Sequence, residues 1–264
     1  MRVNGKAVAD HIKEEVIKRN SEQTKKVCFT LFDSGLTSKK FVQMKCKFAK
    51  EAGILATVRE YNNLSESEIE KEVAELAKSG YDGIVIQLPL PQGINTQKIL
   101  NLVPVEQDID ILGNESKELY LTGDFQKMPP VARAVQEILQ YYNIDISGKK
   151  ILVVGRGKLV GEPVSIWLRQ MSADFNIVDI NTQIEERNNL FLNADIIISG
   201  AGVPHMIKPS MIKDEVVIVD AGTSEANGKI LGDADPSCED KSCLFTPVPG
   251  GVGPVTVASL FLNI

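Results

Sequence analysis

The stretch ILVVGRGKLVGEP, residues 151–163, decides the fold of half of this chain. Four apolar residues lead directly into Gly155, Gly157 and Gly161, and a helical pattern follows. Glycines after a buried strand permit a tight turn through which the backbone can approach a pyrophosphate, and the amino end of the next helix attracts the same anion. The spacing is one residue longer than the common G-x-G-x-x-G form, and a tight turn without a ligand is the alternative. We predict a dinucleotide-binding turn.

Three further apolar runs follow this turn, and each ends in small or polar residues. They are FNIVDI (175–180), ADIIISGAG (194–202) and EVVIVDAG (215–222). Buried strands that alternate with helical stretches in this rhythm are typical of a doubly wound parallel sheet. A boundary near residues 140–148 separates this half from the first.

The first half also alternates between helical and extended patterns, which indicates an α/β protein throughout. Ser38 suits the N-cap of its helix, and Gly53 suits the stop after it. Residues 90–114 contain several Pro and Gly and are predicted to form a loop. We predict helices over 6–19, 38–52, 66–78 and 133–142, and strands over 27–32, over 54–60 and from Gly83.

Composition excludes several classes of function. The 264 residues carry a formal charge of -6, which argues against a nucleic-acid partner. The sequence shows neither a secretory signal nor an apolar run of roughly 18 residues, so we expect a cytoplasmic protein without a membrane span. The four cysteines form no CxxC pair, which argues against zinc and disulfides, and we expect no metal. His11 and His205 are the only histidines, which disfavours a Ser-His-Asp triad.

Asp179, at the end of FNIVDI, bears on the choice of dinucleotide. A carboxylate at the end of the second strand of such a unit can accept hydrogen bonds from the adenosine ribose hydroxyls. It would also repel a 2′-phosphate, so Asp179 favours NAD over NADP. Arg156, within the glycine-rich turn, could instead serve a phosphate group, which keeps NADP as the alternative.

Candidate reactive residues in the first half are less distinctive. Gln87 closes the apolar run GIVI, at a strand end where α/β proteins place functional groups, although a satisfied amide is the ordinary reading. Lys45 lies on a helix rich in lysines, where a solvated charge is usual. Asp108 and Asp110 alternate in extended chain, so they would point the same way. Without a third ligand nearby, a solvated loop is the default interpretation for both.

The segment TPVPGGVGPVT, residues 246–256, combines restricted and permissive backbone in one loop, which indicates a specific shape. A helix that starts after Pro254 would present its amino end to an anion or a polar ligand.

Taken together, the motifs resemble the methylenetetrahydrofolate dehydrogenase/methenyltetrahydrofolate cyclohydrolase family over nearly the whole chain. The similarity is strongest in PVPGGVGPVTVA (247–258), which matches the family's C-terminal signature almost letter for letter. GIVIQLPLP (83–91), VVGRGKLVGEP (153–163) and NGKAVADHIKEE (4–15) are also close. The order and spacing of the motifs fit the family as well.

The resemblance implies a folate-binding catalytic domain over residues 1–140, with a C-terminal helix over 254–264 that packs back onto it. Residues 141–253 would form the domain that binds NAD or NADP. It also implies a homodimer. The expected reactions are oxidation of 5,10-methylene-tetrahydrofolate to the methenyl cation, and hydrolysis of that cation to 10-formyl-tetrahydrofolate.

Matching positions carry over the family's functional residues. Lys45 falls on the catalytic lysine, Gln87 on the glutamine that partners it, and Asp110 on the aspartate that binds the pterin. The resemblance also implies substrate contacts from Phe41, Leu88, Pro89, Gly251 and Pro254. The cofactor contacts that it implies are Gly155, Arg156, Gly157, Asp179, Ala201, Gly202, Thr223 and Thr256.

Several positions depart from the family pattern. Phe41 replaces a tyrosine, which removes a hydroxyl near Lys45 and predicts weakened hydrolysis. Ile111 stands where a glycine is expected after Asp110, and Gln107 replaces a lysine. The segment PPVARA, residues 129–134, replaces P-C-T-P-x-G. At the cofactor side, Gly157 replaces a serine.

Asp179 and Ile180 replace a His-Ser pair, and the lost hydroxyl again points away from a 2′-phosphate. These departures leave two alternatives open. One is a diverged paralogue that binds folate or dinucleotide without turnover. The other is a dehydrogenase for a different small substrate.

Overall fold

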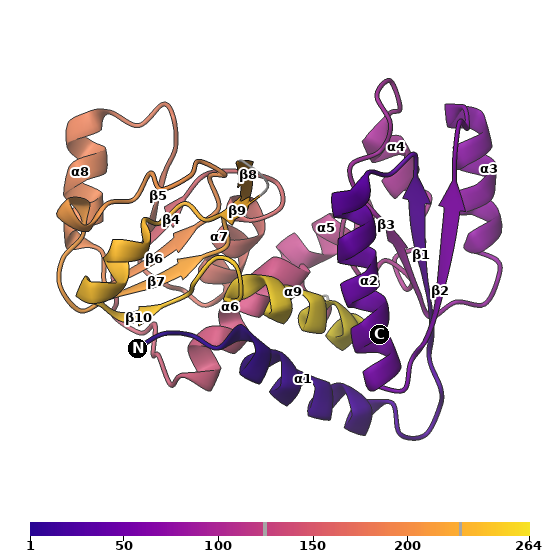
Figure 1. Ribbon diagram of the computed structural model, residues 1–264, viewed down its shortest axis with the longest axis horizontal. Helices are drawn as coiled ribbons and strands as arrows, with labels where there is room; N and C mark the ends of the chain where they lie inside the picture. Colours follow the sequence, from indigo (N-terminus) through magenta and orange to yellow (C-terminus); the bar gives the residue numbers. More distant parts are fainter. Residues whose placement is uncertain (124–125, 227–228) are drawn as a thin grey trace. The chain divides into compact units, whose positions relative to one another are not determined.

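The computed structural model describes residues 1–123, 126–226 and 229–264, which divide into two units (Figure 1). The first unit consists of Asp10–Pro130 and Val257–Ile264. The second consists of Met1–Ala9 and Val131–Thr256. Each unit therefore includes a segment from the opposite end of the chain.

A parallel sheet of order β2-β1-β3 lies at the centre of the first unit. In it, β1 (Lys26–Phe32) pairs with both β2 (Leu55–Tyr61) and β3 (Gly83–Ile86). Parallel neighbours need long crossovers, and α2 (Leu36–Glu51) and α3 (Glu66–Leu76) supply them. Other helical segments with residues in this unit are α1 (Gly5–Arg19), α4 (Thr96–Leu100), α5 (Asn114–Thr122), the last residues of α9 (Val252–Leu260) and the 3-10 helix η3 (Phe261–Asn263).

The side chains of β1 alternate between two apolar layers, because successive residues of a strand face opposite sides of the sheet. Cys28 and Phe32 belong to a buried cluster with Ile69 of α3. On the other side, the ring of Phe261 stacks on Phe48 of α2 with 4.9 Å between centroids, and it meets Phe29 edge-on at 6.4 Å. Helical segments thus cover the apolar layers on both faces of the sheet.

The carboxy-terminal segment packs back onto the first unit, as the resemblance implies. Asn263 is buried and accepts a hydrogen bond from the amide of Met128 through Oδ1, at 3.1 Å. Its Nδ2 donates to the carbonyls of Ile109 and Met128, at 2.8 and 2.9 Å. Phe261 and Asn263 therefore complete a core whose other part is formed by residues 10–130.

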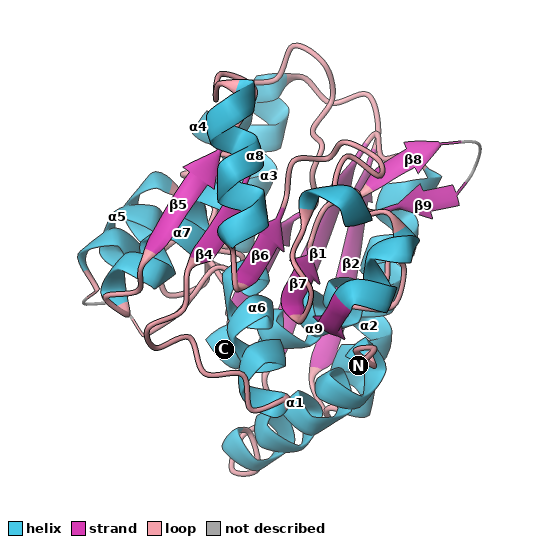
Figure 2. Ribbon diagram, turned by 90° about the vertical axis from the view of Figure 1, so that its left-hand side faces the viewer, coloured by secondary structure: helices cyan, strands magenta, loops and turns pink. Residues whose placement is uncertain are grey.

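The second unit is built on a five-stranded parallel sheet of order β10-β7-β6-β4-β5 (Figure 2). This order reverses direction at β4, which is the doubly wound arrangement expected from the sequence. The strands of the unit, with the separate antiparallel pair β8 and β9 included, are β4 (Ile151–Val154), β5 (Phe175–Val178), β6 (Ile196–Ser199), β7 (Val216–Asp220), β8 (Ser224–Ala226), β9 (Lys229–Leu231) and β10 (Ser242–Phe245). Its helical segments are α6 (Pro130–Tyr141), α7 (Gly161–Gln170), α8 (Ile184–Asn193), η1 (Pro209–Met211), η2 (Pro236–Lys241) and α9 (Val252–Leu260).

Two expectations about helix ends are wrong. Ser38 is not an N-cap, because α2 begins at Leu36 with Gly35 as its N-cap. Ser38 lies inside the first turn, is buried, and donates its hydroxyl to the carbonyl of Leu88 at 3.4 Å. The last long helix begins at Val252 instead of after Pro254. Proline fits there because the amides of a first helical turn have no intrahelical acceptor.

The predicted loop over 90–114 also contains a helix. Asn95 caps α4 by accepting a hydrogen bond from the amide of Lys98, and this capping signal in the sequence was missed. The prediction of an α/β protein with a doubly wound second half is confirmed. Among the helices that the structure describes, none is both long and apolar enough to cross a membrane.

Candidate active site

Lys45, Gln87 and Asp110 come together in the first unit from three separate elements. Lys45 lies on α2, and its Nζ donates to Oε1 of Gln87 at 3.1 Å. The same Nζ lies 3.8 Å from Oδ2 of Asp110 and 6.0 Å from the centre of the Phe29 ring. The Lys45 side chain is 13% exposed and that of Asp110 is 22% exposed. Lys45 is therefore not the solvated charge that its helix alone suggested.

Gln87 is held in place by the end of the strand that precedes it. Its backbone amide continues the β1–β3 ladder by donating to the carbonyl of Thr30 at 3.0 Å. Its side-chain Nε2 donates to the carbonyl of Leu88 at 2.9 Å, which turns Oε1 toward Lys45. Hydrogen bonds therefore fix both the backbone and the side chain of Gln87, and its Oε1 accepts from the Lys45 ammonium group.

Asp110 is positioned by the loop that runs beside β3. Asp108 pairs in a parallel bridge with Ile84, which brings the loop to the carboxyl end of the strand. Asp108 itself is buried and accepts the amides of Leu112 and Gly113, at 3.1 and 2.8 Å. The interpretation of Asp108 and Asp110 as a solvated loop is therefore wrong. Asp108 folds the loop, and Asp110 reaches the lysine.

The charge state of Asp110 is set by opposing effects. Burial raises the pKa of this carboxyl above its ordinary value, and the Lys45 ammonium lowers it, while the Asp108 carboxylate adds a smaller increase. The proximity of Lys45 therefore favours the ionised form against the effect of burial. An ionised Asp110 can accept hydrogen bonds from the N–H groups of a heterocycle.

Ile111 lies between Asp110, which faces Lys45, and Leu112, whose amide donates to Asp108. Its backbone conformation is unfavourable. Its φ is +55°, in the left-handed region, although it is a β-branched residue. The side chain is 1% exposed, so burial of an isoleucine offsets the backbone strain. The glycine that the family has at this position suits the same backbone without strain.

The three substrate positions next to this group are distributed around the end of β3 and on α2. Leu88 and Pro89 follow Gln87 directly, and the Leu88 carbonyl is the acceptor for both Gln87 and Ser38. Phe41 lies one helical turn before Lys45 and is 36% exposed. A phenyl ring there offers an apolar surface but no hydroxyl to hydrogen-bond with the ammonium.

The glycine-rich turn of the second unit brings the end of β4 close to the start of α7. Gly155 follows β4 with φ at +98°. A Cβ on Gly161, the first residue of α7, would lie 2.0 Å from the carbonyl oxygen of Gly155, so only glycine permits this approach. The amino end of α7 has no side-chain cap. The amide of Glu162 donates to the carbonyl of Gly157 at 3.1 Å, and Pro163 has no amide hydrogen, so the turn and the helix start are joined through their backbones. This turn and the start of α7 are the part of the unit where the sequence predicts a pyrophosphate.

Arg156 and Asp179 are joined at one side of this turn. Nε of Arg156 donates to Oδ2 of Asp179 at 2.6 Å. The amide of Asn181 donates to Oδ1 at 2.8 Å. The backbone amide of Asn181, then the Arg156 guanidinium, hold the pKa of the Asp179 carboxyl below its ordinary value, so it is ionised at neutral pH. Ile180 is 97% exposed beside it, and Gly157 lies between Arg156 and the helix.

The other predicted cofactor residues lie on loops that follow β6 and β7 and on α9. Ala201 and Gly202 continue from β6, and the carbonyl of Gly202 accepts the Ser224 hydroxyl at 2.7 Å. Thr223 is exposed at the turn after β7. The hydroxyl of Thr256 donates to the carbonyl of Val252 within α9 at 3.1 Å.

Gly251 and Pro254, predicted to contact substrate, belong to the second unit. The amide of Gly251 donates to the carbonyl of Pro247 at 2.7 Å, which closes the turn ahead of α9. The neighbouring Gly250 carbonyl accepts the amide of Gly5 at 3.0 Å. This turn is therefore tied to the first residue of α1.

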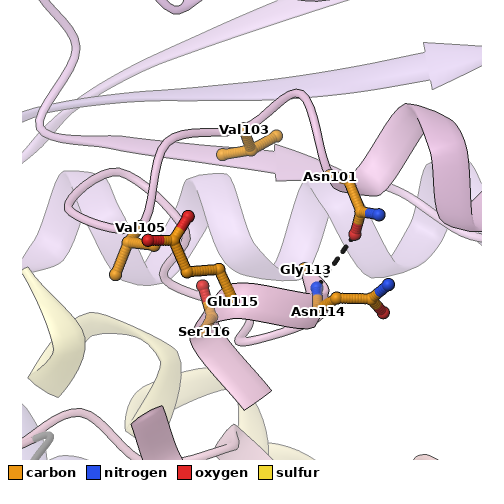
Figure 3. Close-up of a pocket in the computed structure, with 7 residues that line it drawn as sticks. All are labelled: Asn101, Val103, Val105, Gly113, Asn114, Glu115 and Ser116. Atoms are coloured by element: carbon orange, nitrogen blue, oxygen red, sulfur yellow. Dashed lines mark hydrogen bonds between the residues drawn. The ribbon is translucent and has the colours of Figure 1, made fainter. Parts of the chain in front are cut away.

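A cavity of about 220 Å³ lies elsewhere in the first unit, between the end of α4 and the start of α5 (Figure 3). Asn101 bridges it by accepting the amide of Asn114 at 2.9 Å, and the carboxylate of Glu115 lines it. Its lining does not include Lys45, Gln87 or Asp110. Within the described residues, no cluster of three or more His, Cys, Asp or Glu side chains could hold a metal ion.

The fold and the turn geometry define an α/β protein with a Rossmann-type unit. Residues 3–110 match the model of the tetrahydrofolate dehydrogenase/cyclohydrolase catalytic domain. Residues 129–264 match that family's NAD(P)-binding domain. The bifunctional protein FolD of Mycoplasmopsis synoviae is 36% identical over 262 residues, which cover 96% of this chain and 92% of that protein. FolD of Hydrogenobaculum sp. is 33% identical over 273 residues and covers 99% and 96%.

Solved structures agree with this similarity. The bifunctional FolD methylenetetrahydrofolate dehydrogenase/cyclohydrolase of Campylobacter jejuni superposes with a TM-score of 0.94 at 30% identity, over 100% of this chain and 96% of that one. The Trypanosoma brucei enzyme, solved with NADP and an inhibitor, gives 0.92 at 28% identity over 100% and 95%. This chain belongs to the tetrahydrofolate dehydrogenase/cyclohydrolase family, and its second half is an NAD(P)-binding domain.

The positive φ of Ile111 predicts that glycine is tolerated better than alanine at this position, which reverses the usual order. We expect Ile111→Gly to be more stable than Ile111→Ala by about 1 kcal/mol, because glycine adopts a positive φ without the cost that alanine retains. Denaturant unfolding of the two variants measures the difference. Ile109 is also buried, but its φ is not positive. At this control position we expect Ile109→Ala to be more stable than Ile109→Gly. An alanine variant at 111 that equals or exceeds the glycine variant would contradict the strain.

Proposed function

We propose that this protein oxidises 5,10-methylene-tetrahydrofolate to the 5,10-methenyl form with NAD(P)+, and hydrolyses the methenyl form to 10-formyl-tetrahydrofolate. The observation that carries the proposal is the contact of Lys45 with Gln87 and Asp110 within a chain of this family. The division of labour follows the sequence prediction. Residues 1–140 and 254–264 would serve folate, and residues 141–253 would serve the dinucleotide.

Oxidation demands alignment more than proton transfer. When bound, the nicotinamide supplies the acceptor for the hydride that leaves the methylene carbon, and the folate nitrogen lone pair stabilises the resulting cation. Asp110 would hold the pterin through its N–H groups, and Leu88 and Pro89 would contact the ring. Lys45 orients the substrate without exchanging a proton in this step.

Hydrolysis needs a group that handles protons. Water adds to the methenyl carbon, loses a proton, and the carbon–N5 bond then breaks while N5 gains a proton. Lys45 is the group that we assign to this transfer, since it is shielded, held by Gln87, and balanced by Asp110. Phe41 cannot supply a hydroxyl to the ammonium, so the hydrolytic activity should be weaker than the oxidative one.

A substitution at Lys45 separates the two activities. We expect Lys45→Gln to lower methenyl hydrolysis by on the order of 100-fold, the usual contribution of a general acid–base, and to lower methylene oxidation by less than about tenfold. Absorbance assays on purified protein follow NAD(P)H formation and methenyl loss separately. Lys47→Gln is the matched control, because Lys47 lies on the same helix and is 80% exposed. Unchanged hydrolysis in Lys45→Gln would refute the assignment.

We further propose that NAD is the preferred dinucleotide. The ionised Asp179 would accept hydrogen bonds from the ribose hydroxyls and repel a 2′-phosphate. It also holds the guanidinium of Arg156, a cation of the same turn, so this charge is already neutralised. A preference for NADP would require that Arg156 leave Asp179.

Asp179→Ser is expected to shift the ratio of kcat/KM for NAD+ over NADP+ toward NADP+ by about 10–100-fold. The reason is that the negative charge that repels a 2′-phosphate is lost, and the Arg156 guanidinium is released to bind that phosphate. Steady-state kinetics with each dinucleotide measure the ratio. Asp174→Ser serves as control, since Asp174 lies at the amino end of the same strand. Preference of the unaltered protein for NADP+ would overturn the proposal.

A second copy of the chain is the partner that we propose, as the resemblance implies. β2 lies at the edge of the three-stranded sheet and exposes the apolar side chains of Leu55 and Val58. An exposed edge strand with apolar residues is a surface that folded proteins usually cover. A homodimer through this edge would bury both residues.

Light scattering of the full chain at micromolar concentration should therefore give twice the mass of one chain. Val58→Lys places a charge at the proposed contact and should shift the mass toward the monomer. Lys18→Glu changes a charge on α1, a helix outside the sheet, and should leave the mass unchanged. A monomeric wild-type protein would exclude the homodimer.

A further inference from the structure

Two buried carboxylates lie in the second unit, outside the positions considered so far. Asp220 is the last residue of β7 and is 1% exposed. Asp233 follows β9 by two residues and is 0% exposed. Burial of a carboxylate is costly unless hydrogen bonds satisfy it, so two such groups in one region require an account.

Asp233 connects the end of a strand to the loop that leaves it. Its Oδ2 accepts the hydroxyl of Ser199, the last residue of β6, at 2.6 Å and the amide of Ala201 at 2.7 Å. Its Oδ1 accepts the amide of Val203 at 2.8 Å. A single side chain therefore fixes the backbone on both sides of Gly202 through hydrogen bonds to its two carboxyl oxygens.

Asp220 in turn holds the segment that carries Asp233. Its Oδ2 accepts the amide of Ala234 at 2.8 Å, and its Oδ1 accepts that of Gly222 at 2.9 Å. The backbone of Asp233 is also held, because its carbonyl accepts the amide of Ile207 at 3.0 Å. The position of Asp233 is thus determined from β7, which is a neighbour of β6 in the sheet.

The two carboxylates fit against glycines with no room to spare. A Cβ on Gly222 would lie 2.2 Å from Cγ of Asp233, and a Cβ on Gly232 would lie 2.3 Å from Oδ2 of Asp220. Each carboxylate therefore packs on a backbone that lacks a side chain. The loops after β6 and β7 are held at the separation that these contacts define.

Burying these two carboxylates side by side costs folding free energy. Burial raises the pKa of the Asp220 carboxyl to about 6, and the Asp233 carboxylate contributes to the same increase. The donors to the two side chains include the Ser199 hydroxyl and several backbone amides, all neutral. An arrangement that is expensive for folding is the kind retained where backbone placement matters for a site.

We propose that Asp233, held by Asp220, is the positioning residue for the dinucleotide-contacting loop at Ala201–Val203. It acts through the loop amides and does not itself touch the dinucleotide. Ser224 fixes the same loop from another side through the Gly202 carbonyl. The inference rests on the proposed role of Ala201 and Gly202 in cofactor binding, and it adds the residue that gives these two their backbone geometry.

Asp233→Asn tests the proposal because the amide has the same shape but only one acceptor oxygen. Its NH2 group would face an amide or hydroxyl donor, so part of the loop loses its partner. We expect the Kd of NAD+ and of NADP+, measured by calorimetry on the full chain, to rise by about 10–100-fold. The KM for methylene-tetrahydrofolate should change by less than about threefold.

Two further variants keep the test decisive. Asp235→Asn alters a partly exposed carboxylate two residues along, which caps η2 and pairs with Lys208, and it should leave the dinucleotide Kd unchanged. Ser199→Ala removes one of the three donors to Asp233 without leaving an unpaired loop amide. It should raise the same Kd by a few-fold, and it decides the question if Asp233→Asn does not fold.

The outcomes separate this inference from the proposed function. Failure of the unaltered protein to bind either dinucleotide would refute the function itself. If the unaltered protein binds, then wild-type Kd values in folded Asp233→Asn, or in Ser199→Ala alone, overturn the role of Asp233. An equal rise in dinucleotide Kd and folate KM would also overturn it, since that result indicates general damage to the fold.

Discussion

The contact between the Gly155 carbonyl and the Cα of Gly161 is the constraint on which the second unit depends. The turn after β4 and the helix can approach so closely only because Gly161 has no side chain, since a Cβ there would lie 2.0 Å from the Gly155 carbonyl oxygen. That approach directs the amino end of α7 toward the turn and leaves its amides without a side-chain cap. The Arg156–Asp179 pair lies beside the same turn, so the proposed phosphate contact and the proposed ribose contact depend on one local geometry.

The glycine turn could be predicted from sequence because its physics is local. Strand, turn and helix are contiguous, and the residues that matter are glycines whose role depends on their own backbone. Lys45 could not be singled out in this way. Its shielding comes from Gln87 and Asp110, which are distant along the chain, so the residues alone could not separate it from Lys47. Only the family resemblance pointed to it.

Carboxylates were the residues that sequence reasoning read least well. Asp108 and Asp110 look alike in the sequence, yet one folds a loop by accepting two amides and the other faces an ammonium group. Asp233 likewise organises a loop through amides. Whether an aspartate accepts from the backbone or faces a ligand depends on tertiary contacts, which neither spacing nor periodicity reveals.

The exchange of terminal segments between the units has a consequence for how the chain is made. Synthesis is vectorial, and residues 10–130 leave the ribosome well before Phe261 and Asn263 do. Until then, the apolar layer between Phe29 and Phe48 lacks the ring that stacks on it, and Met128 lacks its amide partner. The unit formed mainly by residues 10–130 is therefore completed only by the last residues of the chain. Its core stays open while residues 131–256 are synthesised.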